Sequence, residues 1–490
     1  MPPMPRAVLR TCLTVSGLVA VAVATAALTV ACSVVTKVDF NECTVSAECR
    51  GAFGLGWVCG DAGLCEEVTP QPRCKRVFPE DLFTNEAYRD AVVFGSLFDH
   101  NTEDGDLKLV NAASLAIDEA NASGLTEGRL FGIVHCDYQE NKKIDDLTYE
   151  QAAVANAKYL VDDIGAIAII GPGTSGLAEA VFRELQRPEH APTAVIISPS
   201  ATSPSLTDID VRDGDKPGLF WRTAPPDSQL GADLAGHMTA EKVTSATVIY
   251  ANDSYGSGLA GALQASYGGN YDEIVFTDTA GILAAVEQVS KLPSGDDVAV
   301  VFIGSEVAQA SAFLNAAAPY PFYAASRIFL GDAAYNKDFL NSTQEAKALY
   351  PQVRGVFPGS PSGPNYTSFV SRYLAVFKED PKDASYSSQT YDATWLGLYG
   401  TAWAQFQREG VLTGLNVAFG LQRISDTKGV AVDVNRDGWN IVKREFKAGH
   451  SINITGASGD LQYDPETEET TATVVYWKIN DAGTDFENVP

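Results

Sequence analysis

Apolar runs of strand length alternate with helical stretches along most of the chain. From Asp90 onward, "AVVFGSLF", "LFGIVHC", "AIAIIG" and "TAVIISP" are separated by segments with a helical pattern, such as "LKLVNAASLAIDEANASG" and "TYEQAAVANAKYLVDD". Strands that are buried on both faces and alternate with helices form parallel sheets with right-handed crossovers. The pattern therefore predicts an α/β unit built as a doubly wound parallel sheet.

The same alternation starts again after "GLFWRTAPPDSQ". The runs "SATVIYAND", "DEIVFTD", "DVAVVFIG" and "SRIFLGD" are interleaved with the helical segments "GLAGALQASYG", "ILAAVEQVSKL" and "EVAQASAFLNAAA". Two such units joined by a proline-containing segment predict two lobes, with a cleft where the carboxyl ends of the strands meet. Near the end, "GASGDLQYDPETEETTATVVYWKI" is typical of a closing hairpin.

The first residues have the features of an export signal. Arg6 and Arg10 precede an uncharged apolar run that ends at Ala31. Cys32 follows small residues and resembles the lipobox cysteine of bacterial lipoproteins, although a threonine stands where that motif prefers Leu, Val or Ile. We expect a signal peptide over residues 1–31 and an exported lipoprotein in the cell envelope, anchored to the membrane through Cys32. An uncleaved signal anchor and simple secretion are the alternatives.

Six cysteines remain once Cys12, in the signal, and Cys32 are set aside. An even number in an exported chain predicts three disulfides. The first four lie in "CTVSAECRGAFGLGWVCGDAGLC", so we expect a small cross-linked module over residues 40–67. A zinc site is the alternative, but the segment has no histidine and no C-x-x-C. The six are Cys43, Cys49, Cys59, Cys65, Cys74 and Cys136, and a bond between the last two follows only because they are left over.

The length of the chain and its net charge limit its organisation and its partners. With 490 residues the chain exceeds the ~250–300 residues at which single cores stop growing, so more than one folding unit is expected. The formal charge is −27, from 35 Lys+Arg against 62 Asp+Glu, which makes nucleic acid a poor partner.

The stretch "AIAIIGPGTSGLAEAV" contains the spacing G-x-G-x-x-G at Gly171, Gly173 and Gly176. A dinucleotide site needs this motif at the first strand-to-helix turn and an acid ~20 residues later, whereas here the turn is the third and the later segment is "IISPS". A nucleophile elbow would need glycine at Leu177. We therefore expect no cofactor and no enzymatic activity, because no nucleophile, base and orienting group can be assembled.

Two turns bring hydroxyl groups to neighbouring strand ends. The glycine-rich turn delivers Thr174 and Ser175 to a helix N-terminus, where free N–H groups and the helix dipole favour an anion, although plain N-capping is the alternative. The next strand ends in "IISPSATSPSLT", which includes Ser200 and Thr202. Convergent hydroxyls at adjacent strand ends predict a site for a small carboxylate.

Metal sites are not favoured by the histidines or the acidic loops. His135 and Cys136 are neighbours on an expected strand, so their side chains point to opposite faces and cannot chelate together. "DVNRDGWNIVKR" begins like a calcium loop but has Arg444 where a bidentate glutamate is required. A turn before a helix is the better interpretation of that segment.

The order of the segments resembles one known family. "GPGTSG", "SPSATSP" and "NDSYGSG", together with "FWRTAPPDSQ" and "FLGD", are similar in order and spacing to the leucine/isoleucine/valine-binding family of type I periplasmic binding proteins. The resemblance covers roughly Asp90 to Asn480. It implies two Rossmann-like lobes joined by three crossovers, which close on a ligand like a hinged clamp.

The resemblance also implies roles for individual residues. Ser175, Ser200 and Thr202 would hold the carboxylate of an amino acid. Tyr255 would pack over the ligand and Asp332 would take its ammonium group, unless they serve only in turn packing and helix capping. An aromatic residue before the long first-lobe helix matches Tyr386, for which a core position is the alternative.

Two departures from the family pattern concern the ligand. Asp104 replaces a tyrosine of the first loop, and Ser305 and Glu306 stand where an aromatic residue is often found. Both changes remove apolar wall and add negative charge. We expect a ligand more polar than a branched-chain amino acid, with a cationic or amide group.

Together these observations predict a lipid-anchored, ABC-transporter-type binding protein that captures an amino acid or similar small carboxylate and delivers it to a membrane permease complex. A sensor or scaffold that uses the same clamp to report to a protein partner is the alternative. The expected organisation is a module over 40–67, a linker over 68–88, a first lobe over 89–225 plus about 356–450, and a second lobe over 226–355 plus about 451–490.

Overall fold

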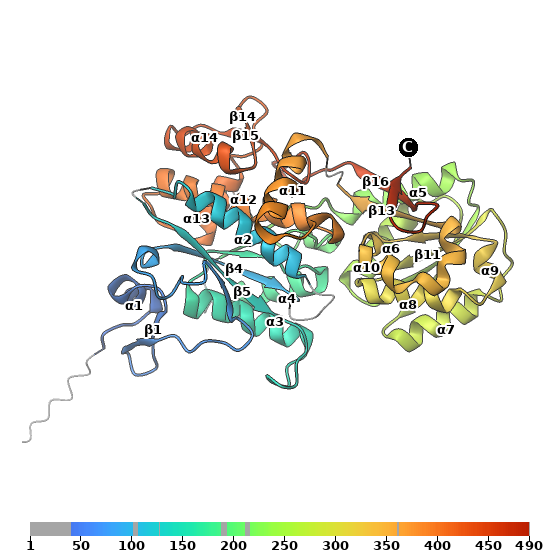
Figure 1. Cartoon of the computed structure of the whole chain (residues 1–490), viewed down its shortest axis with the longest axis horizontal. Helices are drawn as coiled ribbons and strands as arrows, with labels where there is room; N and C mark the ends of the chain where they lie inside the picture. Colours follow the sequence, from blue (N-terminus) through green and yellow to red (C-terminus); the bar gives the residue numbers. More distant parts are fainter. Residues whose placement is uncertain are drawn as a thin grey trace, which may run out of the picture.

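The computed structural model shows two α/β lobes side by side, with a small disulfide-linked module on the outer side of the first lobe (Figure 1). It describes residues 41–100, 106–126, 128–187, 194–210, 216–359 and 362–489. The predicted fold class is confirmed: each lobe has a mainly parallel sheet covered by helices on both faces.

The first lobe is built on a six-stranded sheet in the order β3-β5-β4-β6-β7-β8. Strand β3 runs antiparallel to β5, and the other neighbours are parallel. Strands β4 and β5 are buried along their whole length, which agrees with their continuous apolar sequence. The strands are β3 (Arg76–Phe78), β4 (Val92–Phe98), β5 (Phe131–Asp137), β6 (Ala168–Ile170), β7 (Val195–Ser198) and β8 (Phe220–Arg222).

Helix α12 (Ser387–Gln407) is the central helix on one face of this sheet, where it packs on three other helices. Most of its residues are buried on every side, as expected for a helix with little amphipathic character. The helices on this face are α2 (Leu107–Asn121), α11 (Gly363–Phe377), α13 (Gly414–Leu421) and α14 (Arg436–Lys447); α3 (Tyr149–Lys158), the π-helical turn η2 (Tyr159–Ile164) and α4 (Ser175–Leu185) lie on the other (Figure 1).

The second lobe has a seven-stranded sheet in the order β10-β9-β11-β12-β13-β16-β17. Its first five strands are parallel, whereas β16 and β17 form an antiparallel hairpin at the edge. The strands are β9 (Ser245–Ala251), β10 (Asn270–Phe276), β11 (Val298–Ile303), β12 (Arg327–Leu330), β13 (Val353–Pro358), β16 (Val474–Ile479) and β17 (Phe486–Asn488). The helices are α5 (Asp227–Ala240), α6 (Ser254–Ser266), α7 (Thr279–Val289), α8 (Val307–Ala317), α9 (Pro321–Ala324) and α10 (Lys337–Ser342).

The remaining helical segments are short 3-10 turns. They are η1 (Glu86–Tyr88), η4 (Pro204–Leu206), η5 (Asp332–Ala334), η6 (Gln344–Gln352) and η7 (Pro381–Asp383).

The chain passes between the two lobes three times: after β8, after β13 and before β16. The last passage differs from the range 451–490 that the sequence assigns to the second lobe. Strand β15 (Ile452–Thr455) pairs with β14 (Val430–Asp433), and Ile452 and Ile454 pack in the first lobe's core. The chain enters the second sheet at Val474, the first residue of β16. The hairpin expected in the preceding segment is present only as an isolated bridge between Tyr463 and Thr470.

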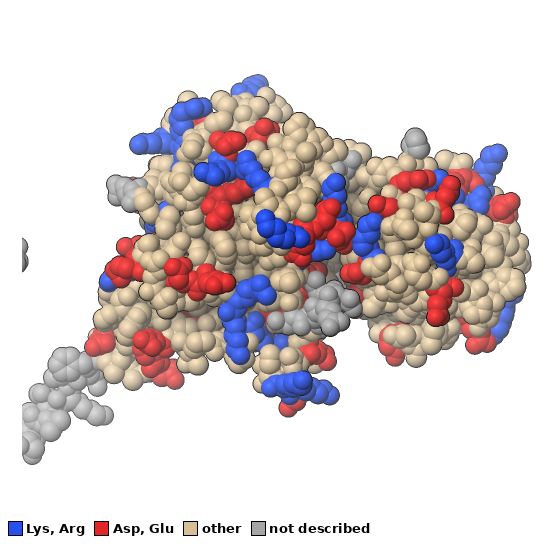
Figure 2. Space-filling view, in the orientation of Figure 1, with Lys and Arg blue, Asp and Glu red and all other residues tan. Residues whose placement is uncertain are grey.

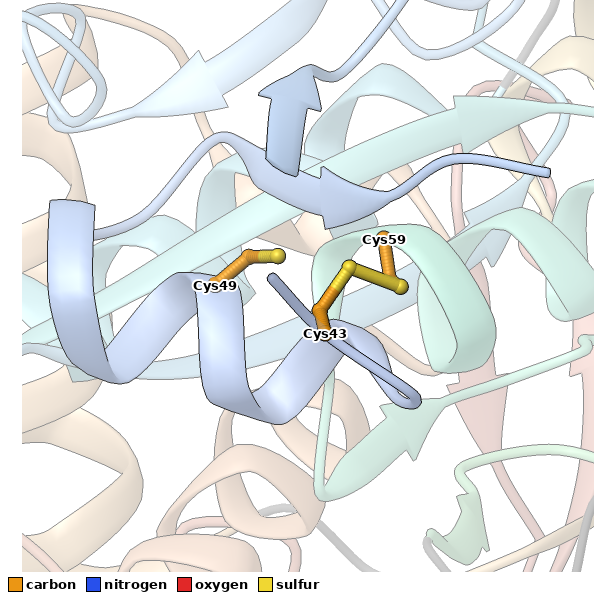
Figure 3. A group of neighbouring side chains, drawn as sticks. All are labelled: Cys43, Cys49 and Cys59. Carbon is orange, nitrogen blue, oxygen red and sulfur yellow. A yellow bond between two sulfur atoms is a disulfide. The ribbon is translucent and has the colours of Figure 1, made fainter. Parts of the chain in front are cut away.

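The range 68–88, expected to be a linker, also contributes to the first lobe. Residues Arg76–Phe78 form the edge strand β3, and a disulfide joins Cys74 to Cys136 on β5. All three expected disulfides are present. The module comprises helix α1 (Ser46–Phe53) and a two-stranded hairpin of β1 (Trp57–Cys59) and β2 (Cys65–Glu67). It is held by the disulfide Cys43–Cys59, drawn in Figure 3, and by Cys49–Cys65.

No helix among the described residues is long and apolar enough to cross a membrane. On the face drawn in Figure 2, acidic and basic side chains are scattered over both lobes without a broad basic surface.

Candidate functional site

A cavity of about 610 Å³ lies where the two lobes face each other. It receives the carboxyl ends of strands from both sheets, which is where ligands bind in open parallel sheets. Its lining includes seven of the nine residues proposed from the sequence as ligand-binding: Thr174, Ser175, Ser200, Tyr255, Glu306, Asp332 and Tyr386. Of the other two, Thr202 is buried and does not line the cavity, and Asp104 lies outside the described residues.

The glycine-rich turn after β6 places the N-terminus of helix α4 at the cavity. Gly171 has φ +98°, and a Cβ there would lie 2.5 Å from the Leu97 carbonyl oxygen of β4, so only glycine fits. Thr174 is the N-cap residue, but its side chain makes no capping hydrogen bond. The first N–H groups of α4 therefore have no partner from their own helix or its cap, and they face a cavity suited to an anion.

Hydrogen bonds join this turn to the neighbouring turn after β7. Ser200 Oγ donates to the Gly173 carbonyl (2.7 Å), and Ser198 Oγ donates to the Pro172 carbonyl (2.7 Å). Ser175 Oγ accepts the N–H of Ser203 (3.1 Å), so its own hydroxyl proton is free to be donated. The Ser175 hydroxyl proton is thus available to a partner in the cavity, whereas that of Ser200 is used by the Gly173 carbonyl.

Asp332 lies between two tyrosine hydroxyls. Tyr255 Oη and Tyr386 Oη each donate to one of its carboxylate oxygens. All three residues are buried. Burial raises the pKa of Asp332, while the two hydroxyls act in the opposite direction. A ligand ammonium group at this place would supply the positive charge that the carboxylate lacks among its described neighbours.

Tyr386 connects the two lobes at this point. It directly precedes helix α12 of the first lobe, but its ring packs against Phe357 of the second lobe, with centroids 5.0 Å apart. Its φ of +62° is the left-handed conformation, which is costly for a bulky residue. Such strain is characteristic of binding and switch positions, and here it directs the hydroxyl at Asp332.

The sequence analysis missed a second acid, Asp227, at the start of α5. Its carboxylate oxygens and the Thr202 hydroxyl are fully buried and close to each other, but they are not aligned as a good hydrogen bond, and no other partner contacts them among the described residues. Burial and the nearby Asp332 raise the pKa of Asp227 well above its usual value, and the Thr202 hydroxyl lowers it in part. In the sequence, "APPDSQ" is indistinguishable from an ordinary helix start, so no signal separates Asp227 from a cap.

Further acidic residues from both lobes line the cavity. Asp99, at the end of β4, accepts a hydrogen bond from Gln139 (2.9 Å). Burial and the adjacent Asp99 raise the pKa of Asp106 to about 7. Glu306 enters from the second lobe, where burial and Asp253 raise its pKa.

The described residues contain no free metal-binding cluster. The sulfur atoms of Cys43, Cys49 and Cys59 lie close together (Figure 3), but all three cysteines form disulfides, Cys49 with Cys65. His135 is a buried core residue, and both of its ring nitrogens form hydrogen bonds, with the hydroxyl groups of Ser96 (2.6 Å) and Ser114 (3.0 Å).

The comparisons with known proteins agree with this fold. The family model described as "Receptor family ligand binding region" matches residues 108–481. An amino acid binding protein of Pseudomonas aeruginosa is 32% identical over 159 residues, which are 31% of this chain and only 36% of that relative.

Solved structures cover more of the chain at lower identity. The branched-chain amino acid transporter substrate binding protein LivJ of Streptococcus pneumoniae, in complex with isoleucine, is 20% identical, covers 81% of this chain and 99% of its own, and has a TM-score of 0.60. A solute binding protein of an ABC transporter of R. palustris, in complex with 4-hydroxybenzoate, is 13% identical, with coverage of 82% and 96% and a TM-score of 0.60. At these identities the likeness concerns the fold.

Proposed function

The chain belongs to the receptor family of ligand binding regions, and on that basis we propose that it is the substrate-binding protein of an ABC-type transporter, with an amino acid or similar small carboxylate as its ligand. The observation that carries the proposal is that the start of α4, which suits an anion, and the buried carboxylate of Asp332 line one interlobe cavity. The similar proteins are consistent with it, since LivJ holds isoleucine and the R. palustris protein holds 4-hydroxybenzoate.

The α-carboxylate of the ligand binds at the N-terminus of α4. Ser175 donates its free hydroxyl proton, and the first N–H groups of the helix add backbone hydrogen bonds in the field of the helix dipole. A bond between a hydroxyl or N–H donor and a charged oxygen contributes about 1.5–3 kcal/mol. Loss of the Ser175 hydroxyl should therefore weaken binding at least about tenfold.

The α-ammonium group binds at Asp332. Tyr255 and Tyr386 hold this carboxylate in position. Burial and the nearby charge of Asp332 raise the pKa of Asp227. Two carboxylates in a buried place are unfavourable without a cation, so a ligand ammonium relieves a repulsion that exists in the empty site. An amino acid carries an anionic and a cationic group on the same carbon, so it can bind to the start of α4 and to Asp332 at once.

Closure of the lobes completes the site. Contacts already join them beside the cavity: Ser254 Oγ on α6 donates to Glu179 on α4 (2.9 Å), and Ser203 Oγ donates to the Ser254 carbonyl (2.7 Å). Because the lining residues come from both lobes, a bound ligand bridges them and favours the closed arrangement. Small-angle scattering should show a smaller radius of gyration with ligand than without it.

Export and anchoring form part of the same proposal. The apolar run before Cys32 directs the chain out of the cytoplasm, lipidation of Cys32 retains it at the membrane, and a permease complex receives the ligand there. A Cys32→Ser variant should appear in the soluble fraction, whereas the unchanged protein fractionates with membranes.

The binding proposal is tested by thermal unfolding with a panel of amino acids and small carboxylates. The purified protein is first unfolded with its disulfides intact and refolded, so that carried-over ligand is removed. A ligand that binds only the folded state raises the midpoint by mass action. One compound should raise it, and Ser175→Ala should diminish the effect; no shift with any compound would overturn the proposal.

A sensor or scaffold is the second candidate, favoured by the surface of the cysteine module. Val45, Phe53 and Leu64 of this module are 55%, 50% and 44% exposed, which leaves apolar side chains available to a protein partner. Under this alternative, the module rather than a permease contact transmits the ligand-bound state. Absence of binding by every small ligand, together with retention of a protein partner, would favour it.

A further inference from the structure

Helix α6 of the second lobe packs against the first lobe beside the cavity (Figure 1). Its neighbours there are helix α4, whose N-terminus suits an anion, and the 3-10 turn η4 that follows β7. We call the four residues that meet at this place the interlobe contact: Glu179, Ser203, Ser254 and Gly258. None of the four lines the cavity, so any effect that they have on a bound ligand is indirect.

Two hydrogen bonds of Ser254 cross from one lobe to the other. Its Oγ donates to a carboxylate oxygen of Glu179 on α4 (2.9 Å), and its carbonyl accepts from Ser203 Oγ (2.7 Å). The other carboxylate oxygen of Glu179 accepts from Arg183 (2.8 and 3.0 Å), which holds the acceptor in place. Hydrogen bonds of this length form only while the two lobes touch, so both bonds stabilise the arrangement in which the cavity is narrow.

The backbone of α6 also comes very close to the first lobe at Gly258. A Cβ at this position would lie 2.8 Å from Ser203 Oγ and 2.8 Å from Pro204 Cδ. Ordinary contacts between non-bonded heavy atoms lie at about 3.5–4.0 Å. The obstructing atoms belong to a buried serine and to a rigid proline ring, which have little freedom to move aside. Glycine at this position therefore allows the lobes to approach as closely as they do.

The interlobe contact is joined to both groups that are proposed to bind the ligand. The N–H of Ser203 donates to Ser175 Oγ (3.1 Å) at the start of α4. Tyr255 directly follows Ser254 on α6, and its hydroxyl donates to Asp332. The contact thus fixes the start of α4 relative to the residue that holds Asp332. A ligand that binds at both places is held most strongly while the contact is formed.

We propose that Glu179, Ser203, Ser254 and Gly258 are positioning residues that keep the lobes together around a bound ligand and so determine how slowly the ligand dissociates. This role depends on the proposed binding function, in which a ligand bridges the lobes. The interlobe contact and the ligand favour the same arrangement, because each joins the two lobes. Weakening the contact lowers the population of that arrangement, and the affinity falls by the same factor.

Two glycines on α6 provide a matched test. Gly258 and Gly261 are three positions apart on the same helix, but a Cβ at Gly261 would meet no atom of the described residues within 4 Å. Alanine favours the helix over glycine at either position. Gly258→Ala and Gly261→Ala therefore differ chiefly in the clash with the first lobe, and Gly261→Ala is the control.

The probe is the compound, among the standard amino acids and 4-hydroxybenzoate, that raises the unfolding midpoint of the stripped, refolded protein most. Isothermal titration gives its affinity, and rapid-mixing kinetics give its dissociation rate. Gly258→Ala should bind the probe about tenfold more weakly than Gly261→Ala, mainly through faster dissociation. Without the probe the two variants should unfold at similar midpoints, because each lobe keeps its own core.

A second pair of variants tests the hydrogen bonds without adding an atom. Ser254→Ala removes the donor to Glu179, whereas Ser257→Ala removes a hydroxyl that donates only to the Asp253 carbonyl of the same helix (2.6 Å). Dissociation of the probe should be about threefold faster or more in Ser254→Ala than in Ser257→Ala, since a hydrogen bond to a charged acceptor is lost. This pair decides the same point if Gly258→Ala does not fold.

The results separate the positioning role from the proposed function. If Gly258→Ala and Gly261→Ala bind and release the probe alike, the positioning role is wrong, while the binding function stands because both variants bind. Equal dissociation rates for Ser254→Ala and Ser257→Ala would overturn the role of the hydrogen bonds in the same way. If the unchanged protein binds none of the compounds, the proposed function fails, and the positioning role fails with it.

Discussion

Arg222 and Glu469 form a buried, bidentate ion pair at the point where the chain last leaves the first lobe. Arg222 Nε and Nη2 lie 2.6 and 2.5 Å from the two Glu469 carboxylate oxygens, and the arginine side chain is 1% exposed. Its Nη1 donates to the carbonyls of Ala201 (3.1 Å) and Ser203 (2.9 Å). The pair therefore fixes the hydroxyl turn beside the anion site to the segment that leads into the second lobe.

Arg222→Met should destabilise the protein and weaken ligand binding together. Removing one partner of a buried pair leaves an uncompensated charge and typically costs about 3–5 kcal/mol. The double variant Arg222→Met/Glu469→Leu should recover much of this stability but not the affinity, because the turn at Ala201 and Ser203 stays unsupported. Chemical denaturation and ligand titration on the same samples measure the two effects, and full recovery of affinity would contradict the positioning role.

Asp332→Asn should separate binding from stability. The variant loses the negative charge that meets the ligand ammonium, so affinity for an amino acid should fall by at least tenfold, in line with the about 2–5 kcal/mol for truncated buried charge pairs. Because burial raises the pKa of Asp332, removing its charge should leave the ligand-free midpoint unchanged or raise it. A variant that binds normally would exclude Asp332 as the ammonium site.

The ligand-free protein should lose stability as the pH rises from 5 to 8, in part because of Asp106. Its folded-state pKa of about 7 exceeds the unfolded value, so the folded state binds more protons between about pH 4 and 7, and stability falls over that window. The groups that raise this pKa are Asp99, Glu306 and Asp137. In the Asp106→Asn variant, the thermal unfolding midpoint should fall by a few degrees less over this pH range than in the unchanged protein. A change of about 1 kcal/mol corresponds to ~2–4 °C in domains of this size.

The disulfides should differ in their importance for the binding lobes. Cys74–Cys136 closes a loop with a sequence separation of 62 residues within the first lobe, and replacing both cysteines by serine should cost about 2–4 kcal/mol. Cys43–Cys59 closes a loop within the module only. Its double serine variant should disrupt the module but leave the ligand-induced midpoint shift of the lobes, which thermal unfolding with the identified ligand can measure.

The features predictable from sequence were those encoded locally. Buried strands and the turn at Ser175 each follow from a short apolar run and the residues that end it, whereas Asp332 is suggested only by the family resemblance. Gly171 is an example: its positive φ and its close approach to β4 require glycine, and the glycine can be recognised in the sequence. The role of such a residue can be predicted without knowing which distant parts of the chain it contacts.

The features that could not be predicted depend on long-range contacts. Asp227 resembles a common helix start, and only the packing around Asp332 and Thr202 shows that its carboxylate has no partner. Residues 452–455 form an ordinary strand pattern, and nothing local indicates that they pair with β14 rather than joining the second sheet. The role of Arg222 likewise depends on its ion pair with Glu469, which is 247 positions away in the sequence.

The most direct test of the proposed function is a titration of the stripped protein with the amino acid that gives the largest midpoint shift and with the carboxamide of that amino acid. The amide keeps the ammonium group and the side chain but removes the anion that α4 is expected to bind. The amino acid should bind at least tenfold more tightly, and Ser175→Ala should narrow the difference. Equal binding of acid and amide would contradict a carboxylate site at the start of α4.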